Sequence, residues 1–191
     1  MLLSSRFEEA LIFATRLHAA QTRKESGTPY IAHLLAVAAL VLEYGGDEDT
    51  AIAALLHDAV EDQGGAATRA AIAARFGEPV AAIVDGCSDT DVVPKPPWQA
   101  RKEAYIAHIA AAPPAVLLVS AADKLHNARS ILADYRQVGE ALWERFTGSR
   151  AGTLWYYRAL VTAYRQSAAP PALIDELDRT VTELERLAGA A

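Results

Sequence analysis

The sequence predicts an all-α protein, a bundle of about 8–10 helices, on three observations. Alanine and leucine are abundant, and hydrophobic residues make up 52% of the 191 residues, enough for a sizeable core. No run of β-branched residues alternates with polar residues, as a half-buried strand would require. Glycine or proline pairs separate the apolar stretches. We find no internal repeat, so we expect residues 1–191 to form one domain.

The helix boundaries follow from residues that typically begin or end a helix. Ser5 and Glu8 form a capping box, and Thr28 before Pro29 is typical of an N-cap and a first helical position. Glycine pairs end two further helices. The expected helices cover about residues 5–20, 29–44, 49–62, 68–77, 78–85, 98–111, 114–137, 140–146, 154–166 and 172–187, with an irregular segment over 88–97.

The composition argues against several functional classes. Acidic residues outnumber basic ones by 24 to 18, and the net charge of −6 is unlike a general nucleic-acid-binding surface. The single cysteine, Cys87, permits no intramolecular disulfide, which fits a reducing compartment. The sequence shows no signal peptide and no apolar stretch long enough for a membrane span. We therefore expect a cytoplasmic protein that binds neither nucleic acid nor membrane.

The stretch AALLHDAVEDQGG, residues 53–65, places unusual charge at the end of an apolar helix. His57, Asp58, Glu61 and Asp62 fall in its last turn and a half, where the helix dipole disfavours carboxylates. A bound divalent cation would compensate, because imidazole nitrogen and carboxylate oxygen are common ligands. A His-Asp doublet at a helix end also occurs by chance, so this stretch alone is weak evidence.

Two other apolar helices each contain one polar residue of the same kind. His33 lies in YIAHLLAVAALVL, and Asp123 lies in LLVSAADKLHNA. A lone histidine on an apolar face is more often a core residue than a ligand, but a buried carboxylate is costly without a partner. One metal ion would explain all three features.

The order of these residues, H…HD…D, resembles the signature of the HD-domain metal-dependent phosphohydrolases. The segments HAAQTRKESGTPYIAHLLAVA, ALLHDAVED, FGEPVAAIVDGCSD, RKEAYIAHI and VSAADKLHNARSI resemble, in this order, the hydrolase domain of the RelA/SpoT type. The single-domain members of that family are the small alarmone hydrolases. The resemblance covers about residues 7–165 and implies a single HD-domain helical bundle, followed here by a C-terminal helix over about 172–187.

The resemblance also implies roles for individual residues. One divalent metal ion, in that family usually Mn²⁺, would be bound by His33, His57, Asp58 and Asp123. Glu61 and Asp62 match the acidic pair that activates or orients the attacking water. The substrate would be contacted by Arg23, Lys24, Lys124 and Asn127. Without the resemblance, Arg23 and Lys24 would be interpreted as a solvated basic loop.

The resemblance becomes weaker toward the C-terminus. Arg150 lies in the glycine-flanked loop TGSRAG, where we expect it to meet a phosphate. Of the aromatic residues at 155–157, we select Tyr156 as a group that stacks on a base or ribose. Packing against the core explains these aromatic residues equally well.

These inferences predict a Mn²⁺-dependent enzyme of alarmone metabolism and the stringent response. It would remove the 3′-pyrophosphate of (p)ppGpp and release pyrophosphate with GDP or GTP. One alternative is an HD phosphohydrolase that acts on another nucleotide, such as an adenine alarmone, a nucleoside monophosphate or a dinucleotide phosphate. A second alternative is a nucleotide-binding protein without turnover. Whether the chain forms a homo-oligomer stays open.

Overall fold

The computed structural model describes residues 2–23, 26–88 and 96–189 and confirms the all-α prediction. Extended pairing in these ranges is limited to one isolated bridge between Thr22 and Pro29. The helices are α1 (Ser5–Leu17), α2 (Ile31–Glu43), α3 (Glu48–Leu56), α4 (Ala59–Asp62), α5 (Gly65–Phe76), α6 (Glu78–Cys87), α7 (Trp98–Ile109), α8 (Pro114–Val138), the 3-10 helix η1 (Gly139–Arg145), α9 (Ser149–Arg165) and α10 (Pro171–Gly189). None of the described helices is long and apolar enough to cross a membrane.

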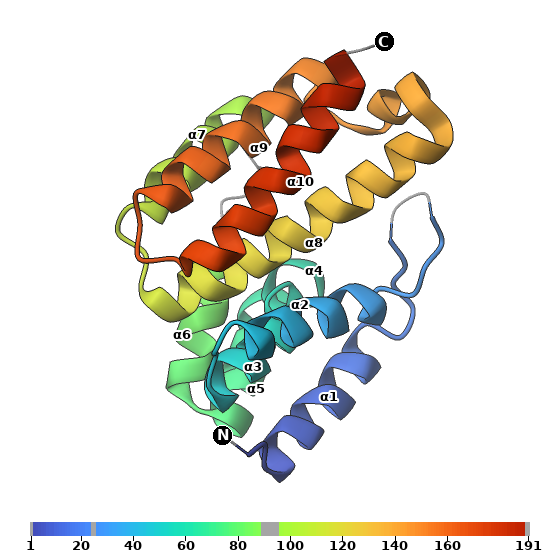
Figure 1. Cartoon of the computed structure of the whole chain (residues 1–191). Coiled ribbons are helices and arrows are strands. Elements are labelled where there is room, and N and C mark those ends of the chain that lie inside the picture. The colour runs from blue at the N-terminus through green and yellow to red at the C-terminus, as the bar shows by residue number, and fades with distance from the viewer. Residues whose placement is uncertain (1, 24–25, 89–95, 190–191) are drawn as a thin grey trace.

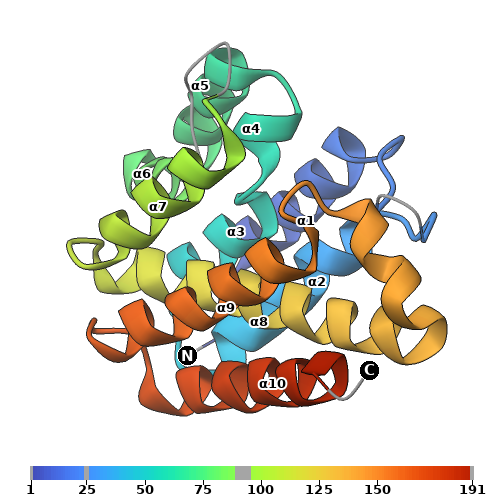
Figure 2. The same cartoon turned by 90° about the horizontal axis from the view of Figure 1, so that it is seen from above.

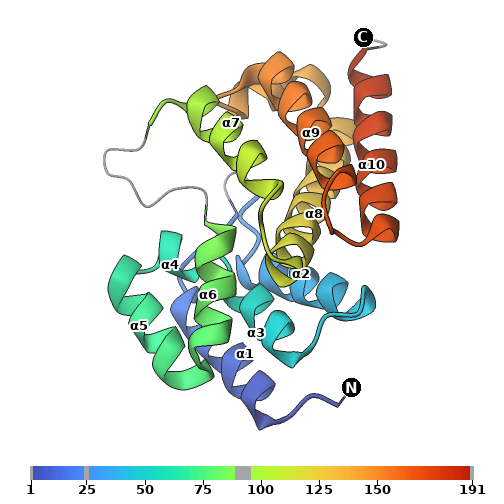
Figure 3. The same ribbon diagram turned by 90° about the vertical axis from the view of Figure 1, so that its left-hand side faces the viewer.

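The long helix α8 lies between the two halves of the bundle (Figures 1 and 3). It packs against α2, α3 and α6 on one side and against α10 and η1 on the other, while α7 packs on α9. Figure 2, seen from above, shows α10 running along α8. The helices share one continuous cluster of buried hydrophobic residues.

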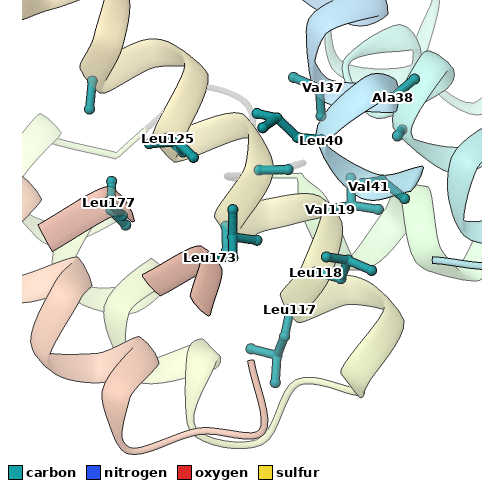
Figure 4. Close-up of a cluster of buried hydrophobic side chains, with 14 of the residues drawn as sticks. Val37, Ala38, Leu40, Val41, Leu117, Leu118, Val119, Leu125, Leu173 and Leu177 are labelled. Atoms are coloured by element: carbon teal, nitrogen blue, oxygen red, sulfur yellow. The ribbon is translucent and has the colours of Figure 1, made fainter. Parts of the chain in front are cut away.

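Leucine and valine side chains fill the space between α2, α8 and α10 (Figure 4). Val41 of α2, Val119 and Leu125 of α8, and Leu173 and Leu177 of α10 are all completely buried. Burying one such side chain contributes about 1.5–3 kcal/mol relative to leaving it in water. Apolar packing therefore holds α8, and every residue on it, in a fixed position relative to α2.

The expected helix over 49–62 is wrong in one respect that matters for the site. The structure divides it into α3 and α4, with His57 and Asp58 in the turn between them. Asp58 has φ −97° and ψ −2° and precedes the first residue of α4. Glu61 and Asp62 therefore belong to a separate short helix and do not continue the helical face of His57.

Two expected helix caps are also wrong. The residue that caps α1 is Ser4, whose side chain accepts a hydrogen bond of 3.2 Å from the Arg6 backbone N–H, so Ser5 is the first helical residue. Helix α2 begins only at Ile31. Pro29 instead forms an isolated antiparallel bridge with Thr22, before the first turn of α2.

The remaining boundary differences are smaller. Helices α5 and α9 begin a few residues before the expected starts at 68 and 154, and the expected helix over 140–146 is the 3-10 helix η1. Thr68 lies inside α5 rather than at its start, and its Oγ1 donates to the Gln63 carbonyl before the helix over 2.6 Å. Most of the segment expected to be irregular, 88–97, lies outside the described residues.

Candidate metal centre

His33, His57 and Asp58 meet where α2 crosses the end of α3. Their ligand atoms all lie within 4.8 Å of one another. His57 Nε2 is 3.1 Å and His33 Nε2 is 3.6 Å from Asp58 Oδ2. Both histidines are at most 3% exposed. Every residue of α3 from 50 to 56 is buried, so the core fixes the position of the doublet that follows.

Asp123 of α8, the helix between the two halves of the bundle, approaches the same point. Its Oδ1 is 3.2 Å from His33 Nε2 and 3.8 Å from His57 Nε2. The structure thus brings together all four residues that the sequence predicts as ligands, from three separate parts of the chain.

The hydrogen bonding of His57 fits a metal ligand. His57 Nδ1 lies 2.8 Å from the Ala54 carbonyl, to which it donates. Its Nε2 atom is then left with a lone pair, is buried and makes no hydrogen bond with any residue that the structure describes. A lone pair that faces carboxylate oxygens is unfavourable unless a cation or a proton lies between them. A set of two imidazoles and two carboxylates therefore fits a divalent metal ion.

The charges of this group also favour a cation. Burial lowers the pKa of His57, but Asp58 and Asp123 outweigh it and raise this pKa well above the ordinary value. Burial raises the pKa of Asp123, but the Lys124 ammonium and the two histidines bring it well below its ordinary value. In the absence of a metal, the carboxylates thus draw a proton to His57.

A second set of side chains holds the carboxylates from outside. The Tyr30 hydroxyl donates to Asp58 Oδ2 over 2.6 Å, and Lys124 Nζ donates to Asp123 Oδ2 over 2.6 Å. The Asn127 amide donates to Asp123 Oδ1. Such outer contacts orient metal ligands and fix which oxygen faces the ion.

The acidic pair lies beside this group on α4. Asp62 Oδ2 accepts a hydrogen bond of 2.7 Å from Gln21 Nε2, and Glu61 is exposed. The side-chain oxygen Oε1 of Gln21 faces His18 and accepts a hydrogen bond from Gln63, so the orientation of the Gln21 side-chain amide is fixed. Desolvation and the charges of Asp58 and Glu61 raise the pKa of Asp62, and the bond from Gln21 only partly opposes this.

A profile of the HD domain family matches residues 10–154 of this chain. The chain belongs to the HD domain family.

Relatives of this HD domain include named nucleotide enzymes. The guanosine-3′,5′-bis(diphosphate) 3′-pyrophosphohydrolase MESH1 of Xenopus tropicalis is 40% identical over 126 residues, which cover 64% of this chain and 68% of that protein. A probable GTP pyrophosphokinase of Mycobacterium leprae is 41% identical over 125 residues, 65% of this chain but only 16% of that protein. A solved structure of a metazoan ortholog of SpoT that hydrolyses ppGpp matches with a TM-score of 0.79 at 27% identity, covering 96% of this chain and 98% of that one.

The predicted substrate residues of this HD domain lie in different surroundings. Arg23 Nη2 donates to Asn127 Oδ1 over 2.7 Å, so both lie next to the metal group, whereas Lys24 is outside the described residues. Arg150 donates to the Ala188 carbonyl and lines a cavity of about 530 Å³ whose wall includes none of the four predicted ligands.

Tyr156 is buried rather than presented on the surface. Its ring lies 6.3 Å from that of Trp98, and Lys102 Nζ lies 5.0 Å from its centroid. The next residue, Tyr157, is also buried and lies near the charged groups of the site. Burial raises its pKa, and the charges of Lys124, Asp123 and Arg23 act on its phenol.

The sequence interpretation missed two residues of the HD domain site, Tyr30 and Gln21, which come from the loop around the Thr22–Pro29 bridge. From its position three residues after Asp123, His126 is expected to support the site or to pack beside it, and the structure places it against His33. The only sequence signal for Tyr30 and Gln21 was their nearness to Arg23, because the contacts themselves depend on how distant elements pack.

Proposed function

We propose that this HD domain hydrolyses the 3′-pyrophosphate of (p)ppGpp in a Mn²⁺-dependent reaction, releasing pyrophosphate and GDP or GTP. One observation carries the proposal. Two buried histidines, the buried Asp123 and the half-buried Asp58 meet at one point, and two carboxylates and an arginine lie next to them. The relation to MESH1, over 68% of that protein's length, supports the choice of substrate.

His33, His57, Asp58 and Asp123 would hold the metal ion. A divalent ion bound there would polarise a phosphoryl oxygen and lower the pKa of water. The mixed nitrogen and oxygen ligands fit Mn²⁺, the ion that the family resemblance implies.

We assign the uptake of the proton to Asp62. The pKa of Asp62 is raised toward the neutral pH range, which suits an efficient general base. In the proposed step, water adds its oxygen to the phosphorus attached to the 3′-oxygen, and one water proton passes to Asp62. The bond from this phosphorus to the 3′-oxygen breaks, and that oxygen takes up a proton. Glu61 would orient the same water from the neighbouring position on α4.

Arg23 would neutralise the pyrophosphate. Its partner Asn127 is uncharged, and within the described ranges Arg23 forms no ion pair, so its positive charge stays available. Arginine donates several N–H groups in a planar arrangement that suits phosphate oxygens. Lys24 would add a second positive charge from the same loop.

Pyrophosphate release from ppGpp by metal-stripped protein, with and without added Mn²⁺, tests the proposal. We expect equal amounts of pyrophosphate and GDP to form only with Mn²⁺. Absence of turnover by protein that binds Mn²⁺ would reject ppGpp as the substrate, and a panel of other phosphorylated nucleotides would then find the correct one. The variant His108→Ala, which removes an exposed histidine of α7, serves as the control.

A further inference from the structure

His33 and His126 contact each other on the side of His33 that faces away from the carboxylates. Their Nδ1 atoms are 2.8 Å apart, and their ring centroids are 4.8 Å apart at an angle of 47°. Two ring nitrogens at this distance share a single hydrogen, because two N–H groups would repel each other, and so would two lone pairs.

The chemistry of the metal group decides which ring carries that hydrogen. His33 Nε2 faces Asp123 Oδ1 at 3.2 Å and Asp58 Oδ2 at 3.6 Å, so Nε2 must keep its lone pair to bind a metal. A neutral imidazole with a lone pair on Nε2 carries its hydrogen on Nδ1. His33 therefore donates, and His126 Nδ1 accepts.

We propose that His126 is a positioning residue, which fixes the tautomer and the ring orientation of His33 by accepting this hydrogen bond. The inference rests on the proposed function only in taking His33 as a metal ligand. The other ring contacts of His33, with Tyr30 at 5.5 Å and His57 at 5.2 Å between centroids, are edge contacts that cannot place a hydrogen.

The position of His126 suits a residue that supports a ligand rather than a ligand itself. His126 is itself outside the cluster of ligand atoms formed by His33, His57 and Asp58 in the described part of the chain. It lies one helical turn after Asp123 on α8, so one helix supplies both a ligand and the support for a ligand from α2.

Mn²⁺ affinity, measured by titration calorimetry on the metal-stripped full chain, tests the proposal without any nucleotide. His126→Ala should weaken Mn²⁺ binding by about 10- to 100-fold, the usual loss when an outer partner of a ligand is removed. His126→Asn should stay close to the parent, because its Oδ1 can accept from the same direction as Nδ1. His108→Ala removes an exposed histidine on α7 and should change nothing.

Circular dichroism and thermal unfolding of the metal-free variants check that each one folds. Parental affinity in His126→Ala, or equal loss in folded His126→Ala and His126→Asn, would overturn the role of His126. If the parent protein does not hydrolyse ppGpp but the Mn²⁺ affinities of the variants follow the expected pattern, the proposed substrate is rejected and the positioning role of His126 is supported. A parent protein that binds no divalent ion would overturn both proposals.

The hydrogen positions can also be observed directly. In protein loaded with diamagnetic Zn²⁺, long-range ¹H–¹⁵N correlation spectra should show His33 protonated at Nδ1 and His126 protonated only at Nε2. The spectrum of His126→Asn assigns the His126 signals by their loss. A hydrogen on His126 Nδ1 in the loaded protein would contradict the proposal, and a residue that merely packs would not fix this tautomer.

Discussion

Arg23 and Asn127 lie 104 residues apart in the chain and are joined by a hydrogen bond of 2.7 Å from Arg23 Nη2 to Asn127 Oδ1. The same Asn127 donates through its amide to Asp123. The side-chain amide of Asn127 therefore links Arg23, in the loop before α2, to Asp123, a predicted metal ligand on α8. This link places Arg23 beside the metal group.

Replacing Arg23 by alanine should mainly raise KM for ppGpp. A hydrogen bond to a charged group contributes about 1.5–3 kcal/mol, so we expect a rise of roughly 10- to 150-fold with kcat little changed. Steady-state kinetics at saturating Mn²⁺ measure this, with Arg16→Ala, an exposed arginine of α1, as the matched loss of charge. A change confined to kcat would place Arg23 in the chemical step instead.

Replacing His57 by alanine should abolish metal binding while leaving the fold intact. The variant loses the unpartnered Nε2 atom that faces both carboxylates, so affinity should fall by more than the roughly 100-fold seen when only an outer partner is removed. Metal analysis of dialysed protein and calorimetry provide the measurement. Retention of one equivalent of metal would remove His57 from the ligand set.

Metal binding should release a proton and weaken as the pH falls. The pKa of His57 is raised in the metal-free protein, and its nitrogen must be neutral to bind, so affinity should drop about tenfold per pH unit below that pKa. Because the folded protein holds the His57 proton more tightly than the unfolded chain does, protonation of His57 stabilises the metal-free fold at low pH. This contribution is lost as the pH rises through the raised pKa of His57. The gain in Tm on adding Mn²⁺ should therefore grow with pH.

Calorimetry in two buffers of different ionisation enthalpy counts the released protons. Identical binding heats in both buffers at neutral pH would contradict this prediction.

Asp62→Asn should retain the metal and lose most of the rate, by about 10²- to 10⁴-fold, because the amide cannot take a proton. In the parent, kcat should fall on the acid side of the raised Asp62 pKa, since the base must be ionised. The pH profile of Asp62→Asn should lack this fall of kcat on the acid side.

Glu61→Gln should also lose rate while keeping Mn²⁺, and unchanged turnover would exclude Glu61 from the mechanism.

The four predicted ligands could be proposed from the sequence because each is a polar or charged residue within, or directly after, an apolar stretch. His33 and Asp123 stand in stretches that otherwise read as core, and the structure finds both almost fully buried. Chain order then matched a known signature, so the fold class followed without any knowledge of packing.

The supporting residues could not be found in the same way. Tyr30 and Gln21 are ordinary polar residues in ordinary local surroundings, and their importance comes from contacts with Asp58 and Asp62. The position of His126 after Asp123 indicates that it lies near the site, but its contact with His33 depends on how α2 and α8 pack. The turn between α3 and α4 was also missed, since neither His57 nor Asp58 is a helix breaker by propensity.

Helix α3 has no side that faces water along residues 50–56, and the His-Asp doublet follows it directly. In this segment there is no surface on which substitutions can accumulate without cost. A designer who wishes to alter stability or solubility should therefore change the outer face of α10, where Arg179 and Arg186 pair with acids of the same helix. Random mutagenesis should show the same asymmetry, with α3 accepting almost no replacements and α10 accepting many on its outer face.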